Sequence, residues 1–389
     1  MVKKVLVVDD SALMRRVMSD IITADKRFEL ADTAGDGLKA YDLIKADPSK
    51  YDIVILDINM PKMNGIQLLE KLEAEKIRIT VLIVSTIAKQ GAAETIKCLE
   101  LGAFDFITKP DSFMETKSQQ FGERIIKYMC EALKMTHTDD ASAPTAATRP
   151  ERTAQPAAPA ASATIATRRE IGGPMSYVRV TSYKKQPHKS VGANASKLVA
   201  IACSTGGPKA LQQLIPMLPK DLNAPVLLVQ HMPAGFTGSL ASRLDEMSQI
   251  KVSEAVDGEI VEKGHVYIAK GGNHLRLIKR GSDYCIELGN EPPRDSLRPC
   301  ADIMYESLYD LDFDEITCVV LTGMGSDGTR GIGKLGTKKN LYVIAQDEAT
   351  STVYGMPRMV FEAGMTDEVV PLGSIADAIK KVVGVTGIR

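Results

Sequence analysis

The chain has 389 residues, more than one ordinary globular core holds, so its length predicts two or three domains. Hydrophobic residues make up 44% of the chain and charged residues 25%, which are the proportions of an average soluble protein. This composition excludes a chain that is disordered over its whole length. The 48 Lys and Arg residues nearly balance the 49 Asp and Glu residues. This net charge of -1 argues against a nucleic-acid binder, which needs a basic excess to neutralise phosphates.

Membrane insertion and secretion are also disfavoured. The longest unbroken apolar run, Leu198–Cys203, has six residues, whereas a membrane-spanning helix needs about 20. The acidic residues Asp9 and Asp10 come too early for the apolar core of a signal peptide. The six cysteines show no paired metal spacing and are typical of reduced thiols. We therefore expect a cytoplasmic protein without direct membrane insertion.

Short β-rich runs alternate with amphipathic helical patterns over residues 1–136. Alternation of strand and helix five times over predicts a doubly wound, parallel α/β domain of flavodoxin-like type. The predicted strands are Val5–Val8, Glu29–Thr33, Ile53–Leu56, Val81–Val84 and Phe104–Thr108.

Residues 137–196 differ sharply in composition from the rest of the chain. Between Thr138 and Thr164 there is no Leu, Ile, Val, Met or aromatic residue, and Ala, Pro, Ser and Thr dominate. Such a segment cannot bury enough apolar surface to offset the entropy lost on ordering it. The remainder is basic and sparse in apolar residues, which suits either a partner-docking segment or, as the favoured interpretation, a solvated tether. We predict a flexible linker over residues 137–196.

Strand and helix patterns resume over residues 197–389. We therefore predict a second α/β domain, a three-layer hydrolase-type domain with a mainly parallel sheet. Residues 258–288 are expected to form antiparallel hairpins inserted into it. The predicted strands are Leu198–Ala202, Val226–Val229, Val266–Ala269, Val319–Thr322 and Tyr342–Ala345.

Three carboxylates follow predicted strands of the first domain. Asp9 and Asp10 come after one strand and Asp57 after another, and the carboxyl ends of parallel strands meet at one edge of a sheet. Converging carboxylates repel each other unless a cation lies between them, and oxygen ligands at a small site suit Mg²⁺. We predict Asp10 as a direct metal ligand and Asp9 as a ligand through water.

The same edge carries groups suited to phosphoryl transfer. A carboxylate can attack a phosphoryl group, which makes Asp57 on the central strand the predicted nucleophile, and we also predict it as a residue of the metal site. Lys109 would neutralise charge on the phosphoryl oxygens, and Ser85 would bind one of them through its hydroxyl. Thr86, adjacent to Ser85, is an alternative source of that hydroxyl. Any one of these groups alone would be an ordinary helix cap or loop residue.

A serine in the second domain lies on a predicted strand-to-helix turn. Ser204 follows a buried strand, and the glycines at 206 and 207 allow a tight turn that would expose its hydroxyl above the sheet. Of the five histidines, only His231 ends a strand at the same edge, so it is the best candidate base. Asp327, in a glycine-rich loop after a third strand, is the candidate orienting acid. A phosphate-binding turn or a simple helix start remains the alternative at Ser204.

The first domain resembles the receiver domain of bacterial response regulators over about residues 1–125. The resemblance rests on the Asp9-Asp10 pair, on Asp57 before Ile-Asn-Met-Pro, and on Lys109 before proline. It implies that Phe106, three residues before Lys109, is the aromatic switch residue of that family.

Residues 197–386 resemble the catalytic domain of the chemotaxis protein-glutamate methylesterases, the CheB family. The resemblance rests on Ser-Thr-Gly-Gly at 204–207, Gln-His-Met-Pro-Ala-Gly-Phe at 230–236 and Thr-Gly-Met-Gly-Ser-Asp-Gly at 322–328. It implies Ser204 as nucleophile, His231 as base and Asp327 as orienting acid. Thr205 and Met324 would lie in the active site, with the Met324 backbone N–H stabilising the oxyanion.

The resemblance implies a phosphorylation-activated esterase whose receiver domain inhibits it until Asp57 is phosphorylated. Its substrates would be glutamate methyl esters of methyl-accepting chemotaxis receptors, with deamidation of receptor glutamines as a second reaction. The phosphoryl donor would be the histidine kinase CheA. We expect Mg²⁺ in the receiver, no cofactor in the esterase domain, and a monomer. The alternatives are a response regulator with a non-catalytic binding domain and a serine esterase for small metabolites.

Overall fold

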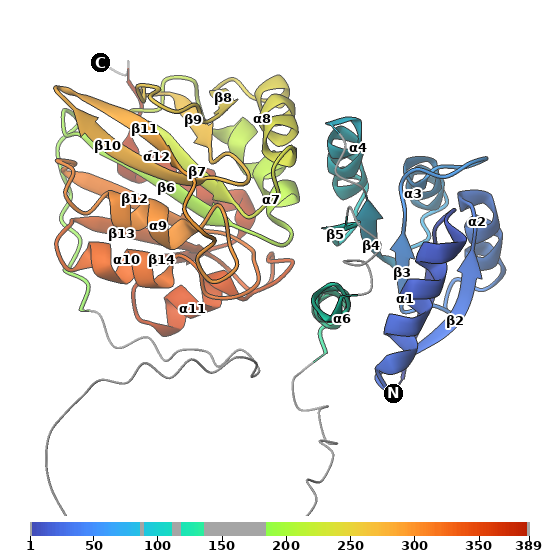
Figure 1. The fold of residues 1–389 in the computed structure, drawn as a ribbon. Helices are drawn as coiled ribbons and strands as arrows, with labels where there is room; N and C mark the ends of the chain where they lie inside the picture. The colour runs from blue at the N-terminus through green and yellow to red at the C-terminus, as the bar shows by residue number, and fades with distance from the viewer. Residues whose placement is uncertain (1, 86–88, 111–117, 136–183, 387–389) are drawn as a thin grey trace, which may run out of the picture. The chain divides into compact units, whose positions relative to one another are not determined.

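The computed structural model of the chain describes residues 2–85, 89–110, 118–135 and 184–386. Residues 137–183 of the predicted linker and Thr86 therefore lie outside the described part. Within that part, one α/β domain precedes the predicted linker and a second follows it (Figure 1).

The described strands of the first domain form a five-stranded sheet in the order β2-β1-β3-β4-β5, and all neighbouring strands are parallel (Figure 1). This order is the flavodoxin-like one that the sequence predicts, so the predicted fold is confirmed. Helix α1 packs against α6, and α3 packs against α2 and α4. The elements are β1 (Lys3–Val8), α1 (Ala12–Ala24), β2 (Phe28–Ala34), α2 (Gly37–Ala46), β3 (Ile53–Leu56), α3 (Gly65–Ala74), β4 (Thr80–Ser85), α4 (Lys89–Glu100), β5 (Asp105–Thr108) and α6 (Gln119–Ala132).

The described strands of the second domain include a seven-stranded parallel sheet in the order β14-β13-β12-β6-β7-β9-β8. The predicted parallel α/β class is confirmed here as well. The elements are β6 (Lys197–Cys203), α7 (Gly207–Leu214), the 3₁₀ helix η2 (Ile215–Met217), β7 (Val226–Gln230), α8 (Phe236–Met247), β8 (Lys251–Glu254), β9 (His265–Ile268), β10 (His274–Arg280), β11 (Asp283–Gly289), α9 (Ala301–Ser307), β12 (Glu315–Val320), α10 (Thr329–Gly336), β13 (Leu341–Gln346), α11 (Met356–Glu362), β14 (Glu368–Val370) and α12 (Leu372–Val383).

The central strand β6 is buried on both faces, which explains its unbroken apolar sequence. Alternate side chains point to opposite faces, so two apolar layers cover the sheet. Val199, Ile201 and Cys203 belong to the layer that includes side chains of α7, α8 and α12. Leu198, Ala200 and Ala202 belong to the layer that includes side chains of α9, α10 and α11.

The predicted hairpin insertion differs in detail from the structure. Strands β10 and β11 form an antiparallel hairpin, and Ile260 pairs antiparallel with Cys285 of β11 through an isolated bridge, whereas β9 joins the parallel sheet between β7 and β8. Strands β8 and β14 were not predicted from the sequence. Both lie at edges of the sheet, where a strand pairs on one side only and needs little apolar sequence; β8 reads Lys-Val-Ser-Glu.

Residues 184–196, the C-terminal part of the predicted linker, run along the second domain; we call them the strap. His188 Nε2 lies 2.6 Å from Glu315 Oε1, and Glu315 Oε2 lies 3.3 Å from Lys197 Nζ. Glu315 and Lys197 are buried at the starts of β12 and β6. Other strap contacts join Lys185 to Asp367, Gln186 to Gly336, Lys189 to Asn340, Ala193 to Asn223 and Ser196 to Asp314.

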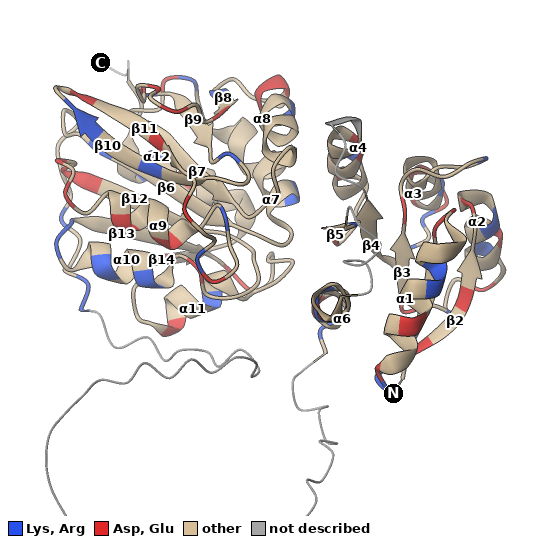
Figure 2. Ribbon diagram, viewed as in Figure 1, with Lys and Arg blue, Asp and Glu red and all other residues tan. Residues whose placement is uncertain are grey.

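Charge is mixed along the described part of both domains, as the near-neutral composition predicts. Figure 2 shows acidic and basic residues on elements of each domain. Among the described helices, none combines the length and the apolar character needed to cross a bilayer. All six cysteines lie among the described residues, and none of them forms a disulfide there.

We predict that His188→Ala in the full-length chain lowers the free energy of unfolding of the second domain by about 1–3 kcal/mol. The substitution leaves one oxygen of the buried Glu315 carboxylate without its partner. Lys184→Ala is the control, because Lys184 is exposed and makes no hydrogen bond to the described residues. Denaturant unfolding followed by circular dichroism measures the difference, and equal midpoints for both variants would contradict the anchoring role of the strap.

Candidate functional site

Ser204 lies directly after β6, at the carboxyl edge of the sheet. Its backbone N–H donates to the Thr322 carbonyl at 3.0 Å, and its carbonyl accepts a hydrogen bond from the Gly207 N–H at 2.7 Å. The turn into α7 passes through Gly206, whose φ is +75°. A Cβ at Gly206 would lie 2.4 Å from the Thr352 Cβ, so both the backbone conformation and the close approach require glycine. The predicted strand-to-helix turn is therefore present at Ser204.

His231 follows β7, the strand next to β6. Its backbone N–H donates to the Cys203 carbonyl at 3.1 Å, which continues the pairing of the two strands beyond their ends. The side chain of Gln230 joins the two loops, because its Nε2 donates to the Ser204 carbonyl at 3.0 Å and to the His231 carbonyl at 3.1 Å. The Cys203 thiol donates to Gln230 Oε1 at 3.0 Å. Gln230 thus fixes the backbones of the candidate nucleophile and base relative to each other.

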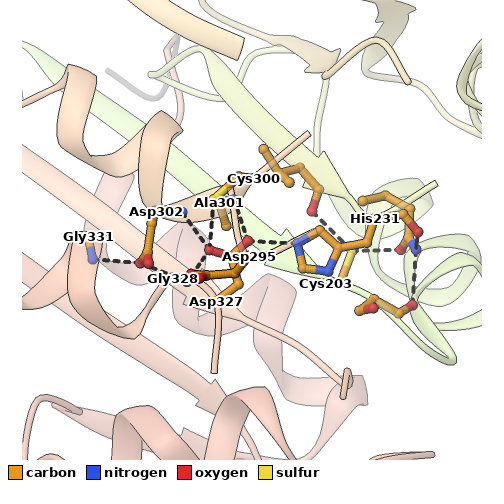
Figure 3. Close-up of polar contacts among 12 residues, drawn as sticks. Cys203, His231, Asp295, Cys300, Ala301, Asp302, Asp327, Gly328 and Gly331 are labelled. Carbon is orange, nitrogen blue, oxygen red and sulfur yellow. Dashed lines mark hydrogen bonds and ion pairs between the residues drawn. The ribbon is translucent and has the colours of Figure 1, made fainter. Parts of the chain in front are cut away.

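Asp327 lies in the loop between β12 and α10, and its buried carboxylate faces the imidazole of His231 (Figure 3). The distance from His231 Nε2 to Asp327 Oδ2 is 2.8 Å. Because an ionised carboxylate only accepts hydrogen bonds, Nε2 carries the proton and Nδ1 is the nitrogen left to accept one. His231 Nδ1 is buried and has no hydrogen-bond partner among the described residues, so Ser204 Oγ is not yet bonded to it.

The Asp327 carboxylate accepts several further hydrogen bonds. Burial would raise its pKa, but the hydrogen bonds from His231 and from the backbone N–H groups of Asp302 and Ala301 outweigh burial and hold the pKa well below its usual range. The Cys300 Sγ lies 3.2 Å from Asp327 Oδ1. Burial and the neighbouring charge of Asp327 raise the pKa of the Cys300 thiol, so the thiol stays protonated and donates. Asp327 is therefore ionised and rigidly held.

The loop that carries Asp327 also approaches Ser204 closely. A Cβ at Gly323 would lie 2.8 Å from the Ser204 Cβ and 2.4 Å from the Met356 Sδ, so no larger residue fits there. The backbone N–H groups of Met324 and Thr205 donate no hydrogen bond to any described residue. Free N–H groups beside a serine can stabilise an oxyanion, which agrees with the predicted roles of these two residues.

The structure brings Ser204, His231 and Asp327 to one edge of the sheet, as the sequence predicts. Sequence reasoning missed Gln230, Cys300 and Asp302, which hold these residues in place. Gln230 had a signal, because a glutamine that ends an otherwise apolar strand needs partners for its amide. Cys300 and Asp302 stand at the start of α9, far from Asp327 in the sequence.

In the first domain, Asp9, Asp10 and Asp57 converge at the carboxyl edge as predicted. One ligand oxygen from each lies within 4.8 Å of the others. Lys109 Nζ lies 2.6 Å from Asp57 Oδ2 and 2.8 Å from Asp9 Oδ2. Burial raises the pKa of Asp57 despite the opposing effect of Lys109. The site carries an excess of negative charge, and its oxygen donors fit Mg²⁺ rather than a softer metal.

The predicted phosphate-binding groups lie beside this cluster. Ser85 ends β4, and its buried Oγ has no hydrogen-bond partner among the described residues, as expected of a group that awaits a ligand. Its carbonyl accepts the Lys109 N–H at 2.7 Å, which joins the two loops. Phe106 lies on β5, three residues before Lys109. Thr86, the alternative to Ser85, is outside the described residues.

Comparisons with known proteins show which families the chain is similar to. A family model described as "CheB methylesterase" matches residues 199–379, and a model described as "Response regulator receiver domain" matches residues 5–118. A Pyrococcus horikoshii protein named protein-glutamate methylesterase/protein-glutamine glutaminase is 38% identical, over 98% of this chain and 93% of its own length. A Bacillus subtilis protein of the same name is 39% identical over 97% of each chain. The crystal structure of the Thermotoga maritima CheB methylesterase catalytic domain is 42% identical and covers 49% of this chain and 100% of its own, with a TM-score of 0.47.

We predict that Asp57→Asn stabilises the first domain at neutral pH when Mg²⁺ is absent. Because the folded-state pKa of Asp57 is raised, its ionised form disfavours folding above that pKa. The gain should disappear as the pH falls from the raised value to the ordinary carboxyl range. Thermal unfolding of the full-length protein across this range measures the effect.

Asp52→Asn is the control with the opposite sign. The pKa of Asp52 is lowered, because its bonds to Lys3 and to the Lys4 backbone outweigh the burial that would raise it. Its ionisation therefore stabilises the fold above the ordinary carboxyl pKa, and this variant should be less stable than the wild type at neutral pH. A destabilised Asp57→Asn variant would show that Lys109 more than compensates the burial of Asp57.

Proposed function

The chain belongs to the CheB methylesterase family of hydrolases, and from this membership we propose that it hydrolyses glutamate methyl esters on methyl-accepting chemotaxis receptors. We propose deamidation of receptor glutamines as its second reaction. The observation that carries the proposal is the 2.8 Å bond between His231 Nε2 and the buried Asp327, beside the turn that presents Ser204. A receiver on the same chain supports a role in chemotactic adaptation.

The proposed chemistry follows from the orientation of His231. Nδ1 accepts the proton of Ser204 Oγ as the oxygen attacks the γ-carbonyl carbon, while Asp327 holds the imidazole and stabilises its positive charge. The Met324 N–H, assisted by that of Thr205, donates to the oxyanion. The carbon–oxygen bond to the methoxy group then breaks, and His231 transfers its proton to the departing methoxide oxygen, which leaves as methanol.

Water completes the cycle by attacking the acyl-enzyme, with His231 again as the base. Deamidation differs only in its leaving group, which is ammonia instead of methanol. Both reactions therefore use one nucleophile, one base and one oxyanion site. No residue of the proposed esterase mechanism requires a metal.

We propose that the receiver accepts a phosphoryl group on Asp57 from the histidine kinase CheA. Asp9, Asp10 and Asp57 would hold Mg²⁺, which supplies positive charge that neutralises the phosphoryl oxygens. Lys109 and the unpartnered hydroxyl of Ser85 would contact those oxygens. A rearrangement of Ser85 and Phe106 on phosphorylation would carry the signal to the rest of the receiver.

The proposed regulation is inhibition of the esterase by the unphosphorylated receiver. Because the strap is bonded to the second domain, the flexible part of the predicted linker would be residues 137–183, about 47 residues, with a root-mean-square span of roughly 35–40 Å. Two domains joined in this way experience an effective concentration approaching about a millimolar, so weak contacts suffice for inhibition. We propose that the protein is a monomer, because none of these steps needs a second copy of the chain. We also propose that it is cytoplasmic.

We predict that Ser204→Ala abolishes methanol release from methylated receptor membranes, reducing it more than about a hundredfold, because the variant lacks the nucleophile. It should still be labelled by acetyl phosphate, since phosphorylation uses Asp57. Ser282→Ala, in the exposed turn between β10 and β11, is the control and should keep wild-type activity. If Ser204→Ala retained a tenth of the activity, another residue would have to be the nucleophile. Activity toward small esters without methanol release from receptors would favour a metabolite esterase.

We predict that a fragment of residues 184–389 is several-fold more active than the unphosphorylated full-length protein and does not respond to acetyl phosphate. The fragment begins at residue 184 so that it keeps the strap and the His188–Glu315 bond. Full-length Asp57→Asn is the companion variant, with basal activity that acetyl phosphate leaves unchanged. Equal rates for the fragment and the unphosphorylated full-length protein would exclude inhibition by the receiver.

A further inference from the structure

A second carboxylate, that of Asp302, lies fully buried beside Asp327 (Figure 3). Its Oδ1 accepts hydrogen bonds from the backbone N–H groups of Gly328, at 3.0 Å, and Gly331, at 2.7 Å. Its Oδ2 accepts one from Arg330 Nε at 3.0 Å. Asp302 belongs to α9, whereas its three donors lie at or directly before the start of α10. The proposed mechanism does not use Asp302.

The two carboxylates cap each other's helices. The backbone N–H groups of Asp302 and Ala301 donate to Asp327 at 2.9 and 2.6 Å, so Asp327 caps the start of α9. The N–H of Gly328, the residue after Asp327, donates in turn to Asp302 and lies at the start of α10. Loss of either carboxylate would leave buried N–H groups unpaired and would loosen the loop that holds the other.

Two neighbouring buried carboxylates need a positive charge beside them to compensate their repulsion. Burial and the neighbouring charge of Asp327 raise the pKa of Asp302, whereas Arg330 opposes the increase. Arg330 reaches Asp302 through Nε and pairs with Asp295, in the loop before α9, through its terminal nitrogen. A cation at Arg330 therefore allows Asp302 to remain charged beside Asp327.

We propose that Asp302 and Arg330 are positioning residues of the esterase. Asp302 holds the Asp327 loop so that the Asp327 carboxylate faces His231, and Arg330 keeps the charge on Asp302 balanced. This inference rests on the proposed function, because it concerns the residues that orient the base. It adds Asp302 and Arg330 to the residues of the site, and it assigns a function to the contact between α9 and the start of α10.

Other ionisable groups lie around Asp302, Asp327 and Arg330. Among the described residues they are the Cys300 thiol, the Tyr305 hydroxyl and the Arg294 guanidinium, which pairs with Glu306 at 2.9 Å. Burial raises the pKa values of Cys300 and Tyr305, so neither group ionises near neutral pH. A change in the pH profile on substitution of Asp302 or Arg330 would therefore report on the charges of those two residues.

The test compares full-length Asp302→Asn and Arg330→Gln in methanol release from methylated receptor membranes as a function of pH. Asp302→Asn should lower kcat about 10- to 100-fold with little change in KM, because the base is misplaced rather than the substrate. Asp302→Asn removes an anion and should move the acid limb of the kcat/KM profile to lower pH. Arg330→Gln removes a cation and should move this limb to higher pH. Each shift should be on the order of half a pH unit. A merely structural role would not produce shifts of opposite sign.

Arg330→Lys is the matched control, because it keeps the charge and should leave the acid limb at its wild-type position. If Asp302→Asn does not fold, the comparison of Arg330→Gln with Arg330→Lys decides the question by itself. Unmoved limbs, shifts in the same direction, or equal shifts for the two Arg330 variants would overturn the inference. If the wild type releases methanol but the variants give any of these three results, only this inference is overturned. If the wild type itself releases no methanol, the proposed function is overturned.

Discussion

Both sites depend on one constraint, which is that all strands within each main sheet run in the same direction. The loops that follow neighbouring strands then meet at a single edge. In the second domain, the pairing of Cys203 with Gln230 and of Ala202 with Val320 places the loops after β6, β7 and β12 side by side. In the first domain, the same geometry joins the loops after β1, β3, β4 and β5. The pairing of the strands is therefore sufficient to bring residues that are far apart in the chain into one site.

The two domains use buried carboxylates in opposite ways. Asp57 and Asp327 are both buried, yet the pKa of Asp57 is raised and that of Asp327 is lowered. The difference arises from their partners. Asp57 accepts one backbone N–H, that of Ile58, and shares one cation, Lys109, with Asp9. Asp327 accepts the backbone N–H groups of Ala301 and Asp302 in addition to the bond from His231. The first arrangement keeps excess negative charge that a metal ion can relieve, and the second keeps a permanent anion suited to orienting a base.

The opposite edge of the second domain contributes stability instead of chemistry. There the strap residue His188 and the strand residue Lys197 enclose the carboxylate of Glu315 at the starts of β6 and β12. Because the two edges are separated by the length of the strands, the strap can anchor the domain without touching Ser204 or His231. This division agrees with the general preference of α/β domains to place ligands at the carboxyl edge and to reserve the amino edge for packing.

The sequence by itself determined the central strands of both sheets, their parallel class, and the residues that follow these strands, including Ser204, His231, Asp327, Asp57 and Lys109. These follow from local apolar runs and from the residues that end them, which are properties of short segments. Only the tertiary structure decided that Nε2 of His231 faces Asp327, that the strap packs on the second domain, and that β8 and β14 complete the sheet edges. It also decided the role open to Asp302, whose bond to the Gly331 N–H spans 29 positions of the chain. Such contacts depend on how two helices pack against each other, and the residue pattern within either helix does not predict that packing.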